Sequence, residues 1–88
     1  MLSPILIIVE PESSWRRAMA CELESSGFEV FETSDYASTV QRVDEIRRIN
    51  LDVWAIVTRP ELIEAVSALG VRTYASSHPM SWVGERSA

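Results

Sequence analysis

This 88-residue chain has few reactive side chains at positions where a catalytic or binding site would be expected. Glu10 and Glu12 follow an apolar run at residues 5–9 and place two carboxylates close together, which suits a hard cation such as Mg²⁺. Thr58 ends a second apolar run and carries a hydroxyl that can accept a phosphoryl group. His78 is the only histidine. These residues are the candidates for a metal or phosphate site.

The candidates also have structural explanations that need no chemistry. Glu12 is favourable at the positive end of the helix that follows it, where it is expected to pair with Arg16 at i+4. Thr58 and Glu61 have the Thr-x-x-Glu spacing of a helix capping box. We therefore expect no metal centre, no cofactor and no enzymatic activity, with Glu10 and Glu12 as the only candidate metal ligands.

The composition is that of one small globular domain. Hydrophobic residues make up 47% of the chain, and acidic residues outnumber basic ones by 13 to 8, for a net charge of −5. This charge disfavours nucleic acid and anionic membranes as partners. The single cysteine, Cys21, excludes an internal disulfide and a thiolate-built metal site. The apolar run at residues 5–9 is too short to span a membrane or to form a signal sequence, so a cytoplasmic location is expected.

Apolar runs alternate with helical periods along the chain, which indicates an α/β domain. The runs at 5–9 and 51–57 are apolar throughout, as is typical of parallel strands covered on both faces. The expected strands are 5–9, 28–33, 51–57 and 71–75, and the expected helices are 12–26, 34–50 and 60–69. The second helix is expected to face the core with Ala37, Val40, Val43, Ile46 and Ile49.

This β-α-β-α-β-α-β order requires a parallel sheet with right-handed crossovers. We expect a single three-layer α/β domain over residues 1–75. Residues 76–88 have no hydrophobic period and are expected to form a C-terminal tail.

Several segments resemble the receiver domains of bacterial two-component response regulators. Residues 8–17 (Ile-Val-Glu-Pro-Glu-Ser-Ser-Trp-Arg-Arg), continuing to Gly27-Phe28-Glu29-Val30, align without a gap to the first strand, first helix and second strand of that family. Residues 34–37 resemble the turn into its second helix, and residues 51–57 resemble its third strand. Over residues 5–60, the resemblance implies a flavodoxin-like fold, truncated here to about four strands in the order 2-1-3-4.

The resemblance also implies which chemistry is missing. Receivers phosphorylate an aspartate that ends the third strand, hold Mg²⁺ with two acidic residues after the first strand, and pair the phosphate with a lysine after the fifth. Here the acidic pair corresponds to Glu10 and Pro11, the acceptor position falls on Val57, and the chain contains no lysine. We therefore expect a pseudo-receiver, not phosphorylated at the usual position, that serves as a protein-interaction or regulatory module in signal transduction. The alternative is a receiver that keeps metal or phosphate binding through Glu10, Glu12 and Thr58.

Two registers are open for the last strand. If it is the family's fourth strand, Ser76 lies near the switch Ser/Thr of the family. If it is the fifth, His78-Pro79 lies where the family has Lys-Pro. Loss of a terminal unit is simpler than loss of an internal one, which favours the first register. His78 alone cannot build a metal centre, and no orienting residue is evident for a catalytic pair with Ser76 or Ser77.

The tryptophans and the last strand indicate how the module would bind partners. Trp54, inside the third strand, is expected in the core. Trp82 stands in the tail, where it either folds back over the sheet or inserts into a partner. A fourth strand at the border of the sheet leaves unpaired backbone groups. We predict a C2 homodimer through this edge and the tail, with Leu69, Val71, Tyr74 and Trp82 at the interface.

Overall fold

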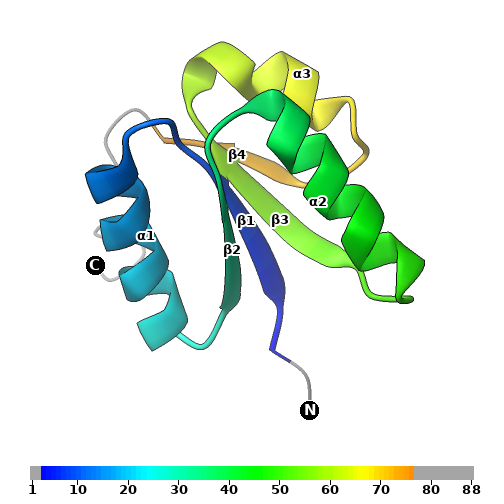
Figure 1. Cartoon of the computed structure of the whole chain (residues 1–88), viewed down its shortest axis with the longest axis horizontal. Helices are drawn as coiled ribbons and strands as arrows, with labels where there is room; N and C mark the ends of the chain where they lie inside the picture. The colour runs from blue at the N-terminus through cyan, green and yellow to red at the C-terminus, as the bar shows by residue number, and fades with distance from the viewer. Residues whose placement is uncertain (1–2, 77–88) are drawn as a thin grey trace.

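A computed structural model of the chain describes residues 3–76 and shows a four-stranded sheet with helices on both faces (Figure 1). The strands are β1 (Ile5–Val9), β2 (Glu29–Thr33), β3 (Val53–Thr58) and β4 (Thr73–Ala75). The helices are α1 (Ser13–Ser25), α2 (Tyr36–Arg48) and α3 (Ile63–Ser67), the last preceded by a 3₁₀ turn, η1 (Pro60–Leu62). Helix α1 lies on one face, and α2 and α3 lie on the other (Figure 1).

All strand pairs are parallel, and the strand order is β2-β1-β3-β4. The predicted α/β class, single sheet and 2-1-3-4 order are therefore confirmed, and the domain is flavodoxin-like. Val9 lies opposite both Thr33 and Thr58, so β1, β2 and β3 end at one level. Near the start of β3 the register shifts, because Ile5 pairs with Val53 while Leu6 pairs with Ala55. Trp54 is the extra residue of this β-bulge.

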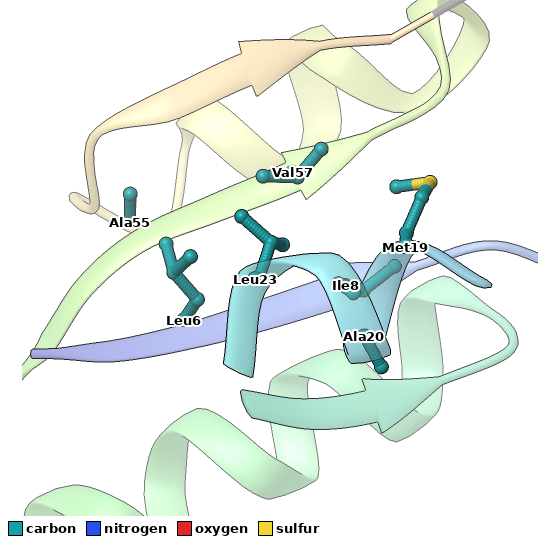
Figure 2. Close-up of a cluster of buried hydrophobic side chains, with 7 residues drawn as sticks. All are labelled: Leu6, Ile8, Met19, Ala20, Leu23, Ala55 and Val57. Carbon is teal, nitrogen blue, oxygen red and sulfur yellow. The ribbon is translucent and has the colours of Figure 1, made fainter. Parts of the chain in front are cut away.

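One half of the core lies between the sheet and α1. Strand side chains alternate between the two faces, so Leu6, Ile8, Ala55 and Val57 share the α1 face and meet the helix there. Helix α1 contributes Met19, Ala20 and Leu23 at the spacing of one helical face, and Figure 2 shows these side chains directed at the sheet. Phe28 and Val30 are partly buried against this cluster.

The other half of the core lies beneath α2 and α3. It combines alternate residues of β1 with Ile56, Val66 and two α2 residues, Val43 and Ile46. The stripe that α2 buries is narrower than predicted: Thr39 joins Val43 and Ile46, while Ala37, Val40 and Ile49 are exposed. Ile49 is 66% exposed because α2 ends at Arg48 and leaves it beyond the last helical turn.

Specific residues next to the helices determine where α1, α2 and α3 begin or end. Asp35 caps α2, accepting a hydrogen bond from the Ser38 N–H at 2.8 Å. Gly27 and Gly70 have φ values of 99° and 78° and follow α1 and α3, as expected of left-handed helix stops. The capping box at Thr58 is wrong. Thr58 is the last residue of β3, and Arg59 precedes η1 without a side-chain capping bond.

Trp54 is not in the core, contrary to the sequence prediction. It is 42% exposed and stands where the register of β3 shifts. The predicted tail begins at Ser76, which is still joined to the sheet: its N–H donates to the Thr58 carbonyl at 2.8 Å.

Candidate functional site

The candidate site lies at the carboxyl ends of β1 and β3, the two central strands, where the chain order across the sheet reverses. Open α/β sheets bind ligands at this topological switch point. Glu10 directly follows β1, and Arg59 directly follows β3. The Arg59 guanidinium donates from Nε to Oε1 of Glu10 at 2.8 Å and from Nη2 to Oε2 at 2.7 Å. This two-pronged geometry is the strong form of an arginine–carboxylate pair.

Glu10 is buried to an unusual degree for a carboxylate, with a relative exposure of 4%. Its Oε2 also accepts the Glu12 N–H at 2.8 Å. Burial alone would raise the pKa of Glu10, but the hydrogen bonds from Arg59 and from the Glu12 backbone lower it below its usual value. Glu10 is therefore a charged, fully engaged group at the mouth of the sheet.

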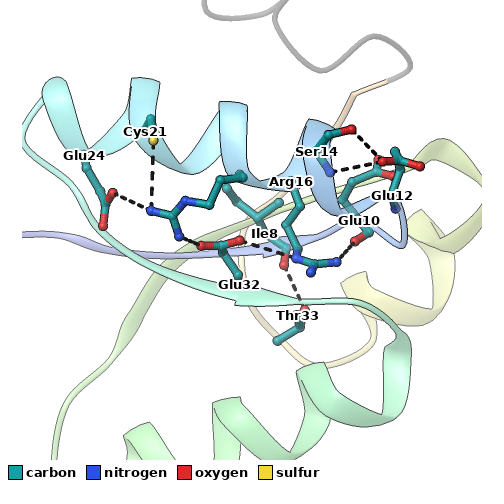
Figure 3. Close-up of polar contacts among 10 residues, drawn as sticks. Ile8, Glu10, Glu12, Ser14, Arg16, Cys21, Glu24, Glu32 and Thr33 are labelled. Carbon is teal, nitrogen blue, oxygen red and sulfur yellow. Dashed lines mark hydrogen bonds and ion pairs between the residues drawn. The ribbon is translucent and has the colours of Figure 1, made fainter.

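Backbone contacts complete the surroundings of Glu10. Arg16, on α1, donates from Nη1 to the Glu10 carbonyl oxygen at 2.8 Å (Figure 3). The same side chain lies 3.4 Å from the Glu32 carboxylate. The predicted i+4 pair between Glu12 and Arg16 is wrong, because Arg16 turns towards β2 and towards the end of β1.

Glu12 has a structural role at the start of α1. Its Oε1 accepts the Ser14 N–H at 3.0 Å and the Ser14 hydroxyl at 2.6 Å, which makes it the N-cap of the helix (Figure 3). These hydrogen bonds lower the pKa of Glu12. The predicted preference of Glu12 for the positive helix end is confirmed.

These residues do not fit Mg²⁺. Both oxygens of Glu10 are taken by Arg59, the position beside Glu10 is Pro11, and Glu12 is used as a helix cap. Within residues 3–76, no group of three or more His, Cys, Asp or Glu side chains is arranged to hold a metal ion. A cation bound at Glu10 would face the Arg59 charge and would have to displace it.

Val57 and Thr58 are both buried, on opposite faces of the sheet. Val57 is 1% exposed, lies opposite Ile8 and packs in the α1-side cluster, one residue short of the end of β3 (Figure 2). Thr58 is also 1% exposed, and its Oγ1 has no hydrogen-bond partner within the described part of the chain. Burial keeps the Thr58 hydroxyl away from any phosphoryl donor in solution.

The remaining sequence candidates are scattered. Pro11 is exposed beside Glu10. Ser76 is 8% exposed at the end of β4 and is held next to β3. Strand β4 pairs with β3 in parallel. His78 lies outside the described residues.

The four predicted interface residues differ in their surroundings. Leu69 and Val71 are partly buried against the core beneath α2 and α3. Tyr74 is 41% exposed on β4 and stacks on Trp54, with 6.4 Å between ring centroids. Trp82 lies outside the described residues. Tyr74 is thus the one member of the set that the structure places at the surface of the sheet.

Sequence reasoning missed Arg59 and a polar cleft near the end of β2. The only sequence feature that could have indicated Arg59 is its position directly after an expected strand and before Pro60. The cleft has a volume of about 400 Å³ and is lined by groups that include Arg16, Ser34 and Arg42. Its cations are already paired, Arg16 with Glu32 at 3.4 Å and Arg42 with Glu45 at 3.3 Å. The cleft therefore offers little net positive charge to an anion.

Comparisons with protein-family models, curated proteins and solved structures give no match for this chain. None of the helices within residues 3–76 has the length and apolar character needed to cross a membrane.

Proposed function

We propose that the chain is a non-catalytic, receiver-like module that binds other proteins in two-component-like signalling and is not phosphorylated at the position corresponding to Val57. The observation that carries the proposal is the ion pair between Glu10 and Arg59. It fills the mouth of the sheet with a fixed internal cation, where a receiver would bind Mg²⁺ between acidic side chains.

The charges at the mouth of the sheet support a module that phosphorylation does not switch between two states. In a metal-dependent phosphotransfer site, cation and phosphate arrive together and change the local charge. Here the Glu10 charge is compensated within the chain by Arg59, so this buried carboxylate does not require a bound cation. The buried Val57 provides no nucleophile, which removes the acceptor half of the reaction.

A protein partner, with a second copy of the chain as the leading candidate, is supported by the border strand. In a parallel pair, alternate residues of each strand bond to the neighbour. The Arg72 carbonyl and the Ser76 N–H bond to β3, so the backbone groups of Thr73 and Ala75 point to the open side of β4. An exposed row of this kind pairs readily with another strand. We therefore propose a homodimer through β4.

Treatment with acetyl phosphate and Mg²⁺, followed by intact-mass spectrometry, tests the loss of phosphorylation. We expect no species heavier by about 80 Da, the mass of one HPO₃ group. Such a species would contradict the proposal, and its disappearance in Thr58→Val would assign the alternative site that uses Glu10, Glu12 and Thr58. A Mg²⁺ titration followed by amide NMR provides the second readout: shifts confined to residues 10–12 would also favour the alternative.

Sedimentation velocity tests the homodimer separately. A dimer is expected to form with increasing concentration, and a strict monomer at ~100 µM would remove the homodimer from the proposal while leaving the lost phosphorylation chemistry untouched.

A further inference from the structure

A row of aromatic side chains, exposed at Trp54 and Tyr74, crosses the α1 face of the sheet. We call Phe28, Trp54 and Tyr74 the aromatic row. Ring centroids lie 5.5 Å apart for Phe28 and Trp54, and 6.4 Å apart for Trp54 and Tyr74. The Arg72 guanidinium lies 4.8 Å from the centroid of Trp54. Stacked aromatic rings with a flanking arginine are the residue types enriched at the centres of protein interfaces.

The aromatic row lies on a part of the sheet that no helix covers. Tyr74 pairs with Val57, whose side chain faces α1, so Tyr74 points to the same face. Helix α1 packs over β1 and β2, while α3 packs on β4 from the other face (Figure 1). Within residues 3–76, no helix covers β4 on the α1 face. Trp54 and Tyr74 consequently remain 42% and 41% exposed.

Residues 77–88 start at the right place and have the right composition to cover this surface. They continue from Ser76, which is fixed beside Thr58 at the carboxyl end of the sheet. They contain three large apolar residues, Met80, Trp82 and Val83. Met80 and Trp82 are two positions apart and would share one face of an extended segment.

The distances match as well. Trp54 precedes Thr58 by four residues, which is roughly 13 Å along a strand. A reversal over residues 77–79 is favoured, because serine and proline are preferred turn residues. Three extended residues from Pro79 to Trp82 then cover about 10 Å in the return direction. This brings the Trp82 side chain to a level between those of Tyr74 and Trp54.

We propose that residues 77–88 fold back over the aromatic row of the same chain, with Trp82 packed against Tyr74 and Trp54. This contact buries apolar surface that would otherwise stay in water. It leaves the outward backbone groups of Thr73 and Ala75 open. The inference is therefore independent of the lost phosphorylation chemistry. It leaves the β4 backbone available for a homodimer, but it assigns Tyr74 and Trp82 to a contact within one chain and not to the dimer interface.

Paramagnetic broadening in the full chain tests the contact. A nitroxide is attached at position 84 of the Cys21→Ser/Gly84→Cys chain, and ¹⁵N spectra are recorded with the label oxidised and then reduced. We expect loss of the Trp54 indole signal and of the Arg72 and Tyr74 amide signals only while the label is oxidised. Signals from α2, on the far face of the sheet, serve as the internal control.

A mixed sample separates this contact from one between copies. Unlabelled ¹⁵N chains are combined with spin-labelled ¹⁴N chains, and the proposal requires that the Trp54 signal keeps its intensity there. Trp82→Ser in the labelled ¹⁵N chain is expected to restore the lost signals, because it removes the side chain that anchors the segment. The proposal is overturned if the aromatic row shows no broadening in the labelled ¹⁵N chain, or if the Trp54 signal is also broadened in the mixed sample, which would assign the surface to a second copy.

Discussion

Arg59 and Glu10 are 49 positions apart in the chain, yet two hydrogen bonds of 2.8 and 2.7 Å join their side chains at the mouth of the sheet. The carboxylate is 4% exposed, whereas the arginine side chain is 41% exposed. The buried Glu10 charge is therefore compensated by an arginine that is itself accessible to solvent. Removing Arg59 would leave an uncompensated charge inside the protein, which is far less favourable than an exposed broken pair.

Arg59→Met is expected to raise the pKa of Glu10. Burial favours the neutral carboxyl, and in this variant the guanidinium no longer opposes it. The pKa is measured by following the Glu10 side-chain carboxyl carbon in an NMR pH titration. Arg48→Met, which breaks an exposed pair with Asp44 on α2, is the matched control and should leave the Glu10 titration unchanged.

Glu10→Gln is expected to reduce the sensitivity of the fold to acid. Because the folded-state pKa of Glu10 lies below its ordinary value of 4.5, its contribution to stability is complete above that pH and is lost as the pH falls through the folded pKa. The variant should lose about 1–2 kcal/mol at pH 7, and less as the pH falls to 3. Urea unfolding at several pH values measures this. A loss that is equal at all pH values would contradict the assignment.

Thr58→Val is expected to stabilise the protein by about 1 kcal/mol, since it replaces a buried hydroxyl that has no hydrogen-bond partner among residues 3–76 by a methyl group of similar size. Thr39→Val is the matched control, because the Thr39 hydroxyl bonds to Thr33 and to the Asp35 carbonyl, each at 2.8 Å. That variant should lose about 1–2 kcal/mol. The midpoints of urea unfolding show whether each variant is more or less stable than the original chain. Destabilisation by Thr58→Val would show that its hydroxyl has a partner.

Ala75→Pro is expected to abolish the proposed homodimer without unfolding the domain. The N–H that proline removes points to the open side of β4, so no bond to β3 is lost. Sedimentation velocity measures the oligomeric state, and circular dichroism confirms the fold. Ala75→Thr keeps the N–H and should still dimerise. A dimer that persists in Ala75→Pro would place the interface elsewhere.

Patterns local in the sequence predicted the fold well. Continuous apolar runs identified β1 and β3, because this signal depends only on neighbouring residues and on whether both faces of a strand are covered. Burial on α2 was predicted less well. Helical spacing cannot tell how much of a helix the sheet covers, and Val40 and Ile49 lie outside the covered stripe.

The candidate site was predicted only in part. Glu10 was identified because it follows β1, but its partner, Arg59, comes from a distant strand end, and only the parallel register brings the two together. Trp54 was misplaced because the whole apolar run was expected to be covered on both faces, whereas Trp54 is the extra residue of a β-bulge and is 42% exposed. Long-range pairing and an isolated irregularity leave no periodic signal in a single sequence.

The irregularity at Trp54 also fixes which change of length β3 can absorb. The strand holds one residue more than its neighbour between the pairs Ile5–Val53 and Leu6–Ala55. Deleting Trp54 would straighten the ladder while residues 55–58 keep their partners, whereas a deletion further along would turn the remaining side chains to the opposite face. Trp54 is thus the one residue of β3 whose deletion keeps the register of residues 55–58. That deletion would also remove the middle member of the aromatic row and separate Phe28 from Tyr74.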